Sequence, residues 1–496
     1  MKAFQLNFIT DKVKLRWFQI LQKLEAINIC TTAQLVSMTN STARTLVTDI
    51  NYLRDYFMDI AEIQSSKQGY SLNMQSSVTY LEKKRMLLED EPLFIILEKI
   101  FFNELMSIYD WADYFHISES TMFNYVKRIS DQIEKFNINL EMNPVNLVGS
   151  ETDIRNFYFA FYYESDVTPH TIFPSIAAQE VVLKVIELLN QPDQKFSSLG
   201  YSSYLLYLSI ERILCGCTVE LKPELKKIVL NDPEFNKLLS ANYLVHRYFN
   251  IDLTQDESIF IYSFVLCRRG IDDPNQEKYF CERYNKWSQI KMLAKTIHQT
   301  FNRSEFTQEY ELILLESFFT STKIRYLICE SGNRNIQDTN EYAKLLFYKE
   351  YKKNKYLLSN TPYFHSLFSE DHLEDICSNL TIFIESIKDK YQKNAANIAF
   401  VFEGNEYISQ HLESLVLKYF GSFQNIYILG PNELCASYIK NNKIDLLVTN
   451  YNEYLTYSSL GPECLLLKTI PDGLDWINLL NKIDPNLQNM FRVRNH

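Results

Sequence analysis

One helical pattern occurs twice in the first third of the chain, about 76 residues apart, and it constrains the fold more than any other feature. In the first copy, apolar residues recur at helical spacing between residues 12 and 24. A second helix is expected to begin at Thr31 or Thr32, because both residue types cap helices. A third helix is predicted after a break at residues 39–41. Its apolar stripe consists of Leu46, Ile50, Leu53 and Phe57.

The segments that follow both helical patterns predict β-hairpins. Residues 60–72 have short apolar runs around a turn at residues 65–69, and residues 138–150 play the same part in the second copy. Pro92 is suited to begin the first helix of that copy. Core and turn positions correspond between the copies: Trp111 and Ala112 match Leu35 and Val36, Ser118 and Thr121 match Thr42 and Thr45, and Val126 and Ile129 match Ile50 and Leu53. Helix, helix, turn, helix and hairpin is the order of a winged helix-turn-helix unit.

Such a unit offers a helix to the major groove of DNA, where its first turns reach base edges while the hairpin holds phosphates. A single trihelical unit is equally compatible with a packing module. Two matched copies favour binding to double-stranded DNA. In the first copy the candidate DNA-binding residues are Thr42, Arg44, Thr45 and Thr48 on the third helix and Lys67 and Gln68 on the hairpin. In the second copy they are Ser120, Thr121, Asn124, Lys127 and Arg128.

The distribution of charge agrees with this assignment only in part. The whole chain carries a net charge of -11, which disfavours a polyanionic partner. Residues 1–85, however, hold eleven basic and seven acidic residues, a net charge of +4. Because few of the candidate side chains can make two hydrogen bonds to one base, we expect DNA shape to contribute to specificity. The abundance of Lys, Asn, Ile, Tyr and Phe is typical of an AT-rich genome, so we expect AT-rich promoter DNA as the partner.

Several other classes of protein are disfavoured. No apolar run reaches the roughly 18 residues of a membrane span, and charges near residues 11–16 argue against an export signal, so we expect a cytoplasmic protein. The nine cysteines lack zinc-binding spacing, which predicts neither a metal site nor disulfides. Glycine-rich phosphate loops are missing, so no nucleotide cofactor is expected. The acidic run Glu89, Asp90 and Glu91 has the character of a solvated linker, and no catalytic constellation is found.

The segment NLVGSETDIRNFYFAFYYES at residues 146–165, together with the tandem helix-turn-helix region and the tail, resembles the Mga/AtxA family of Gram-positive virulence regulators. The resemblance implies a multidomain, mainly α protein that forms homodimers and responds to carbohydrate status through HPr of the sugar phosphotransferase system. It implies two winged helix-turn-helix units, two helical phosphotransferase regulation domains and a small α/β domain like the IIB component of that system. The corresponding boundaries are 1–75, 76–165, 166–285, 286–395 and 396–496.

In such regulation domains the resemblance implies histidine as the phosphoacceptor, since its neutral ring nitrogen is a competent nucleophile. Aligned with the family's helix, the histidine positions of the first domain fall near Leu205 and Phe264, and both are apolar. The substitutes are His170 and His246 in the first domain and His298, His365 and His372 in the second. For each histidine taken singly, the pattern favours a surface or hydrogen-bonded structural role over a phosphoacceptor.

The tail alternates short apolar strands with helices, which predicts a small parallel α/β domain. In IIB enzymes a cysteine follows the first strand, whereas this chain has Glu403, Gly404 and Asn405 there. We therefore expect a scaffold or dimer interface rather than phosphoryl transfer.

Two alternatives remain open at this level. A phosphotransferase phosphocarrier is disfavoured by the missing cysteine and histidines. An RNA-binding antiterminator is disfavoured because such proteins begin with a small β-rich domain, whereas this chain begins with helices.

Overall fold

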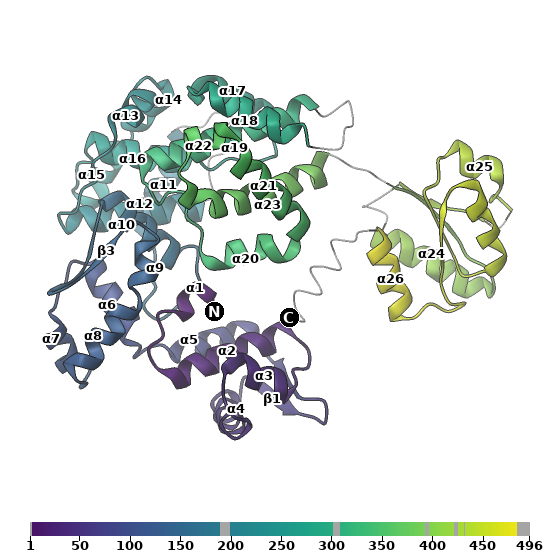
Figure 1. The fold of residues 1–496 in the computed structure, drawn as a ribbon, viewed down its shortest axis with the longest axis horizontal. Coiled ribbons are helices and arrows are strands. Elements are labelled where there is room, and N and C mark those ends of the chain that lie inside the picture. The colour runs from purple at the N-terminus through teal and green to yellow at the C-terminus, as the bar shows by residue number, and fades with distance from the viewer. Residues whose placement is uncertain are drawn as a thin grey trace. The chain divides into compact units, whose positions relative to one another are not determined.

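The structure is a computed structural model that describes residues 2–188, 199–300, 308–391, 396–420, 425–430 and 432–483. The chain forms two compact bodies: an N-terminal body of residues 1–386 and a C-terminal body of residues 387–496. Helices dominate the first body, and a four-stranded sheet organises the second (Figure 1). The multidomain, mainly α fold class is therefore confirmed. The finer domain boundaries stay a prediction.

The first helix-turn-helix unit has the predicted order of elements. It contains α1 (Ala3–Leu6), α2 (Lys12–Ala26), α3 (Thr32–Thr39), α4 (Ala43–Phe57), β1 (Ala61–Ser65), β2 (Tyr70–Met74) and α5 (Ser77–Met86). Thr31 caps α3 in a capping box with Gln34, and Asn40 ends it in a left-handed conformation with φ 48°. The predicted stripe of α4 is buried in the core. Polar caps and an apolar stripe thus suffice to explain both helices.

The second unit repeats this order. Its elements are α6 (Pro92–Phe101), α7 (Ile108–Tyr114), α8 (Glu119–Arg128), α9 (Ser130–Glu134), β3 (Asn139–Met142) and β4 (Val145–Val148). Pro92 occupies the first turn of α6, where its missing N–H has no partner to lose. Both hairpins are antiparallel, with Ile63 opposite Leu72 in the first and Leu140 opposite Leu147 in the second.

The rest of the N-terminal body is helical. Its elements are α10 (Glu151–Tyr162), α11 (Ile176–Leu188), α12 (Leu199–Leu214), α13 (Pro223–Leu230), α14 (Pro233–Leu239), α15 (Asn242–Phe249), α16 (Gln255–Leu266), α17 (Pro274–Tyr284), α18 (Ser288–His298), α19 (Gln308–Ile328), α20 (Gln337–Leu346), α21 (Tyr348–Asn360), α22 (Pro362–Leu367), the 3-10 turn η1 (Glu370–His372) and α23 (Leu373–Tyr391).

The composition of the polar stretch at residues 333–342 predicts a loop, and this prediction is wrong for its second half, because α20 begins at Gln337. Asp338 in the first turn of α20 accepts hydrogen bonds from the backbone N–H groups of Ala3 and Phe4, at 3.0 and 3.2 Å. Ala343 and Leu346 of the same helix are buried. The contact with α1 is a long-range interaction that local sequence does not reveal.

Glu91 is the second correction, because this residue of the expected solvated linker is fully buried. Its carboxylate accepts hydrogen bonds from the backbone N–H of Thr10 and, at 2.5 Å, from the Thr10 hydroxyl. Burial raises the pKa of the Glu91 carboxyl. The segment before α2 is thereby joined to the start of α6. Nearby, Phe4 and Phe8 of the N-terminal segment pack edge-on against Phe161 of α10.

The C-terminal body is a parallel sheet with strand order β6-β5-β7-β8. Its elements are β5 (Asn397–Val401), α24 (Glu406–Phe420), β6 (Asn425–Ile428), α25 (Ala436–Asn441), β7 (Leu446–Thr449), the 3-10 helix η2 (Asn452–Leu460), β8 (Glu463–Leu466) and α26 (Gly473–Ile483). The central strands β5 and β7 are buried along almost their whole length. The predicted small parallel α/β domain is confirmed in type.

Among the described residues, no helix combines the length and the apolar character needed to cross a membrane. The same part of the chain contains no cluster of three or more histidine, cysteine, aspartate or glutamate side chains suited to a metal ion.

Gly69 closes the first hairpin and generates a stability prediction. Its φ is +144°, and a Cβ at this position would lie 2.2 Å from the carbonyl oxygen of Cys30. Cys30 and Tyr70 exchange two backbone hydrogen bonds of 2.8 Å beside it. We expect Gly69→Ala to break this bridge and to destabilise the first unit by more than about 1 kcal/mol. Hydrogen exchange of the Tyr70 amide and the unfolding midpoint measure the effect.

Gly200→Ala is the matched control. A Cβ at Gly200 in α12 meets nothing within 4 Å, so helix propensity predicts an unchanged or slightly higher midpoint. Equal behaviour of the two variants would contradict the role assigned to Gly69.

Candidate nucleic-acid interface

The exposed face of α4 is the candidate reading surface of the first unit. Thr42 caps the helix, accepting a hydrogen bond from the Thr45 N–H at 3.2 Å, and the two hydroxyls lie 2.9 Å apart. Arg44 and Thr48 are exposed, and the Thr48 hydroxyl donates to the Arg44 carbonyl at 3.2 Å. The structure therefore places Arg44 and Thr48 on one open surface, while Thr42 and Thr45 chiefly define where the helix begins.

The wing of this unit is held against α4 by Arg54. Its Nε donates to the Ile63 carbonyl at 2.9 Å and its Nη2 to the Ser65 hydroxyl at 2.8 Å. The predicted wing residues Lys67 and Gln68 are exposed at the hairpin tip. Arg54 was not among the predicted site residues, although its place late on the polar side of the third helix is a usable signal. Arg54, which lies outside the predicted contact residues, thus holds the hairpin in a fixed position relative to α4.

Asp49 joins α4 to α2 and neutralises the charge of Arg16, one of the basic residues of the first unit. Its buried carboxylate accepts hydrogen bonds from Arg16 Nε at 2.8 Å and Trp17 Nε1 at 3.0 Å. Lys84 is likewise paired with Glu25 at 2.6 Å. Within the described part of the chain, Arg44 and Lys67 form no ion pair. The cations left for a polyanion are therefore fewer than the count in residues 1–85 suggests.

In the second unit, α8 carries the corresponding surface. Ser118 caps it, with its hydroxyl 2.8 Å from that of Thr121. Ser120, Asn124, Lys127 and Arg128 are exposed along the helix. All the predicted residues of this unit lie on α8, although Thr121 is partly covered.

A hollow of about 600 Å³ lies between the start of α7, the exposed face of α8 and the turn of the wing. Ser120 and Asn124, both predicted, line it. Tyr109 and Phe123, which were not predicted, also line it and are 64% and 41% exposed. Large exposed aromatic side chains beside polar ones are uncommon on a surface without a partner. The acidic Glu119 lines the hollow as well, so this unit is less cationic than the first.

Helix α10 connects the second unit to the helices that follow, through buried ion pairs. Arg155 binds both oxygens of Glu257 on α16, at 2.5 and 2.9 Å, and also Glu151 at 2.9 Å. Glu151 in turn binds Arg212 of α12 at 2.8 and 2.9 Å. The side chains of Arg155 and Glu257 are 1% and 0% exposed. We call these four residues the α10 ion-pair network.

Further polar side chains of α10 reach the later helices. Asp153 accepts hydrogen bonds from the Ser331 N–H at 2.8 Å and its hydroxyl at 2.6 Å, although burial raises the pKa of this carboxyl. Asn156 donates to the Ser331 carbonyl at 2.9 Å. Polar residues of the SETDIRNF segment therefore bind α12, α16 and Ser331 after α19. Charged residues at close spacing within an otherwise aromatic helix were the available signal.

The structure places the candidate phosphoacceptors in different surroundings. His170 uses both ring nitrogens, with Glu98 Oε2 at 2.7 Å and the Glu89 carbonyl at 2.9 Å. Burial opposes its charged form, but these hydrogen bonds outweigh it and raise the pKa of His170. His298 binds Glu311 at 2.9 Å.

The other three histidines lie at the surface or in the core. His365 binds the Ser359 carbonyl at 2.9 Å and Glu370 at 3.2 Å. His372 is buried, and burial with the nearby Arg334 lowers its pKa. The side chain of His246 is 54% exposed, and its Nδ1 lies 2.9 Å from Asp252.

The positions that lack histidine have structural roles. Leu205 on α12 and Phe264 on α16 are both buried, at 3% and 6% exposure. In the C-terminal body, the loop after β5 contains Glu403, whose carboxylate accepts a hydrogen bond from the Tyr454 hydroxyl at 2.5 Å. Asn405 in the same loop accepts hydrogen bonds from the first turn of α24. The loop residues are thus engaged within their own domain.

Comparisons with known proteins found one matching family model and several similar regulators. Residues 76–162 match the model of the Mga helix-turn-helix domain. The chain is similar to the capsule synthesis positive regulators AcpB and AcpA of Bacillus anthracis. Identity to AcpB is 20%, covering 84% of this chain and 85% of AcpB, and identity to AcpA is 21%, covering 89% and 95%. It is also 22% identical to the anthrax toxin expression trans-acting positive regulator of the same organism, over 76% of this chain and 79% of that protein.

The α10 ion-pair network generates a prediction. Arg155→Met leaves Glu257 buried without its main partner, so we expect the free energy of unfolding to fall by about 3–5 kcal/mol. Replacing both residues, Arg155→Met with Glu257→Leu, removes the unpaired charge and should restore part of the loss. Urea unfolding of the full chain measures both.

Lys237→Met is the control, because Lys237 pairs with Glu234 at a surface site where the lysine side chain is 44% exposed. We expect a change below about 1 kcal/mol. A double variant as unstable as Arg155→Met, or an effect of Lys237→Met of the same size, would count against the assigned role of the network.

Proposed function

The chain belongs to the Mga/AtxA family of DNA-binding transcription regulators, and we propose that its two helix-turn-helix units bind one stretch of duplex DNA together. One observation carries the proposal: α4 and α8 each begin at a hydroxyl cap and present an exposed polar face beside a hairpin. Both helices belong to a single compact body, so their spacing is defined before DNA binds. AT-rich promoter DNA is the proposed ligand.

The two units are proposed to make different contacts. The first unit offers Arg44 and Lys67, which are suited to phosphates because each is an exposed cation. Thr48 and Gln68 lie beside them. In the second unit, Lys127 and Arg128 occupy the far end of α8, while Ser120 and Asn124 line the hollow. Asn124 is the side chain best suited to a base, since an amide can bind adenine through two hydrogen bonds.

Regulation by the sugar phosphotransferase system is the second part of the proposal, with His246 as the acceptor. Its side chain is exposed and Asp252 lies 2.9 Å from Nδ1, so Nε2 is the proposed nucleophile. His170 and His365 have both ring nitrogens engaged, and His372 is buried. HPr is the proposed donor.

A homodimer belongs to the same proposal, with the C-terminal body as the contact. That body exposes Leu417 on α24 and Leu474 and Ile477 on α26, at 61%, 65% and 52%. Exposed apolar side chains that gather into a patch mark a contact surface, and we propose that these three belong to one.

DNA binding is tested by titrating the full chain with AT-rich duplex DNA over a salt series. Arg44→Ala and Lys67→Ala should each weaken binding and reduce the slope of log affinity against log salt by about 0.9. Asn124→Ala should weaken binding by about 1–3 kcal/mol with little change of slope. Lys227→Ala, at an exposed lysine of α13, is the control and should change neither.

Two results would contradict this assignment. One is binding that does not depend on salt or on any of the three substitutions. The other is equal or tighter binding to structured RNA, which would favour an antiterminator.

Phosphorylation is tested by incubating the full chain with phosphorylated HPr and mapping the label by mass spectrometry. We expect label on His246 and its loss in His246→Ala, while His170→Gln retains it. Unchanged labelling of His246→Ala, or none in the native chain, would refute His246 as the acceptor. Onward transfer of the phosphoryl group to a sugar would favour a phosphocarrier.

A further inference from the structure

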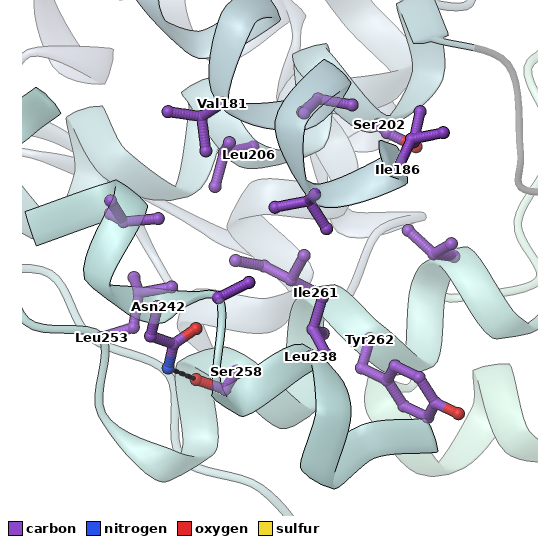
Figure 2. Close-up of a pocket in the computed structure, with 15 residues that line it drawn as sticks. Val181, Ile186, Ser202, Leu206, Leu238, Asn242, Leu253, Ser258, Ile261 and Tyr262 are labelled. Carbon is purple, nitrogen blue, oxygen red and sulfur yellow. Dashed lines mark hydrogen bonds between the residues drawn. The ribbon is translucent and has the colours of Figure 1, made fainter. Parts of the chain in front are cut away.

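A cavity of about 90 Å³ lies among α11, α12, α15 and α16 (Figure 2). Its lining is almost wholly apolar and includes Val181, Ile186, Leu206, Leu253 and Ile261. Protein interiors are normally packed without spaces larger than a water molecule. A cavity lined in this way holds water poorly and is suited to an apolar guest.

Four polar residues, Ser202, Asn242, Ser258 and Tyr262, interrupt the apolar lining. Asn242, at the start of α15, donates from Nδ2 to the Ser258 hydroxyl at 2.9 Å, and Figure 2 shows the two side by side at the edge of the lining. The Asn242 oxygen accepts no hydrogen bond from the described residues. Tyr262 contributes its ring, because its hydroxyl is already bound to Asp232 at 2.5 Å. The cavity therefore offers an incoming molecule the Asn242 oxygen as a hydrogen-bond acceptor in a mainly apolar setting.

We propose that this cavity binds a compact, mainly apolar molecule that carries one hydrogen-bond donor, such as a small phenol or a short branched alcohol. Size limits the class: an engineered cavity of about 150 Å³ holds benzene, so this space of about 90 Å³ takes a short branched chain, and takes a single ring only when its walls move outward. The hydrogen bond to Asn242 orients the donor.

The walls of the cavity also belong to the α10 ion-pair network. Leu206 lies on α12, whose last turn carries Arg212, and Ser258 follows Glu257 directly on α16. Arg212 and Glu257 bind Glu151 and Arg155 of α10, the helix that follows the wing of the second unit. A guest between α12 and α16 changes their spacing and so the position of α10. The effect on DNA rests on the proposed function, whereas binding of the guest does not.

Phenol is the test probe, and toluene is its match in size without a donor. Saturation-transfer NMR and the unfolding midpoint of the full chain measure binding. We expect phenol to bind several-fold to about tenfold more tightly than toluene, the effect of one hydrogen bond. Asn242→Leu should abolish this preference. Val182→Phe should fill the cavity and remove binding of both probes, since Val182 lines it.

Leu183→Phe is the matched control, because Leu183 is the next residue of α11, is 46% exposed and does not line the cavity. It should bind phenol as the native chain does. The unfolding midpoint of each variant without probe reports whether that variant folds. If Val182→Phe does not fold, the loss of the phenol preference in Asn242→Leu tests the proposal instead.

The DNA titration is repeated with saturating phenol. A changed DNA affinity in the native chain, absent in Val182→Phe, supports the proposal. Failure of phenol to bind the native chain, or equal binding by Val182→Phe, overturns it. Phenol binding with an unchanged DNA affinity overturns the link to α10. A chain that binds phenol but no DNA refutes the proposed function and leaves the cavity assignment supported.

Discussion

The ion pairs between Arg155 and Glu257 and between Glu151 and Arg212 are the interactions on which the N-terminal body depends. A charge removed from water costs several kcal/mol unless a partner and further hydrogen bonds replace the solvent. Here they do: Glu257 also accepts the Val219 N–H at 3.0 Å, and Arg212 also donates to the Phe101 carbonyl at 3.0 Å. Partners from α6, α10, α12 and α16 must all be in place together. Such a network is exacting in geometry, and it joins the second helix-turn-helix unit to the helices behind it.

Further side-chain contacts hold α4 and α8 in defined positions. In the first unit, Asp49 holds α2 against α4, and Arg54 holds the wing against α4. In the second unit, the Tyr158 hydroxyl on α10 donates to the Leu97 carbonyl of α6 at 3.0 Å. The exposed polar residues on α4 and α8 therefore project from supported helices, which limits the entropy lost when DNA binds. The same supports provide a route by which events in the later helices reach α8.

Much of the local structure was predictable because its causes are local. Thr31, Thr42 and Ser118 cap helices through their own hydroxyls, and Leu46, Ile50, Leu53 and Phe57 form a helical stripe whatever they face. The residues that were misread or missed have distant partners. Buried Glu91 accepts hydrogen bonds from Thr10, Asp338 accepts them from the backbone of α1, and Tyr109 and Phe123 line the same hollow.

The sequence alone determined the two helix-turn-helix patterns, the helical middle, the parallel tail and the candidate polar residues of each reading helix. Those features follow from periodicity and capping, whose range is a few residues. Only the tertiary structure decided which charges are available: Arg44 is exposed, whereas Arg16, Arg155 and Arg212 are held by carboxylates. It also decided which histidines are exposed and which are buried, and where a cavity remains. Burial and long-range pairing set these properties, and both depend on residues that meet only when the chain folds.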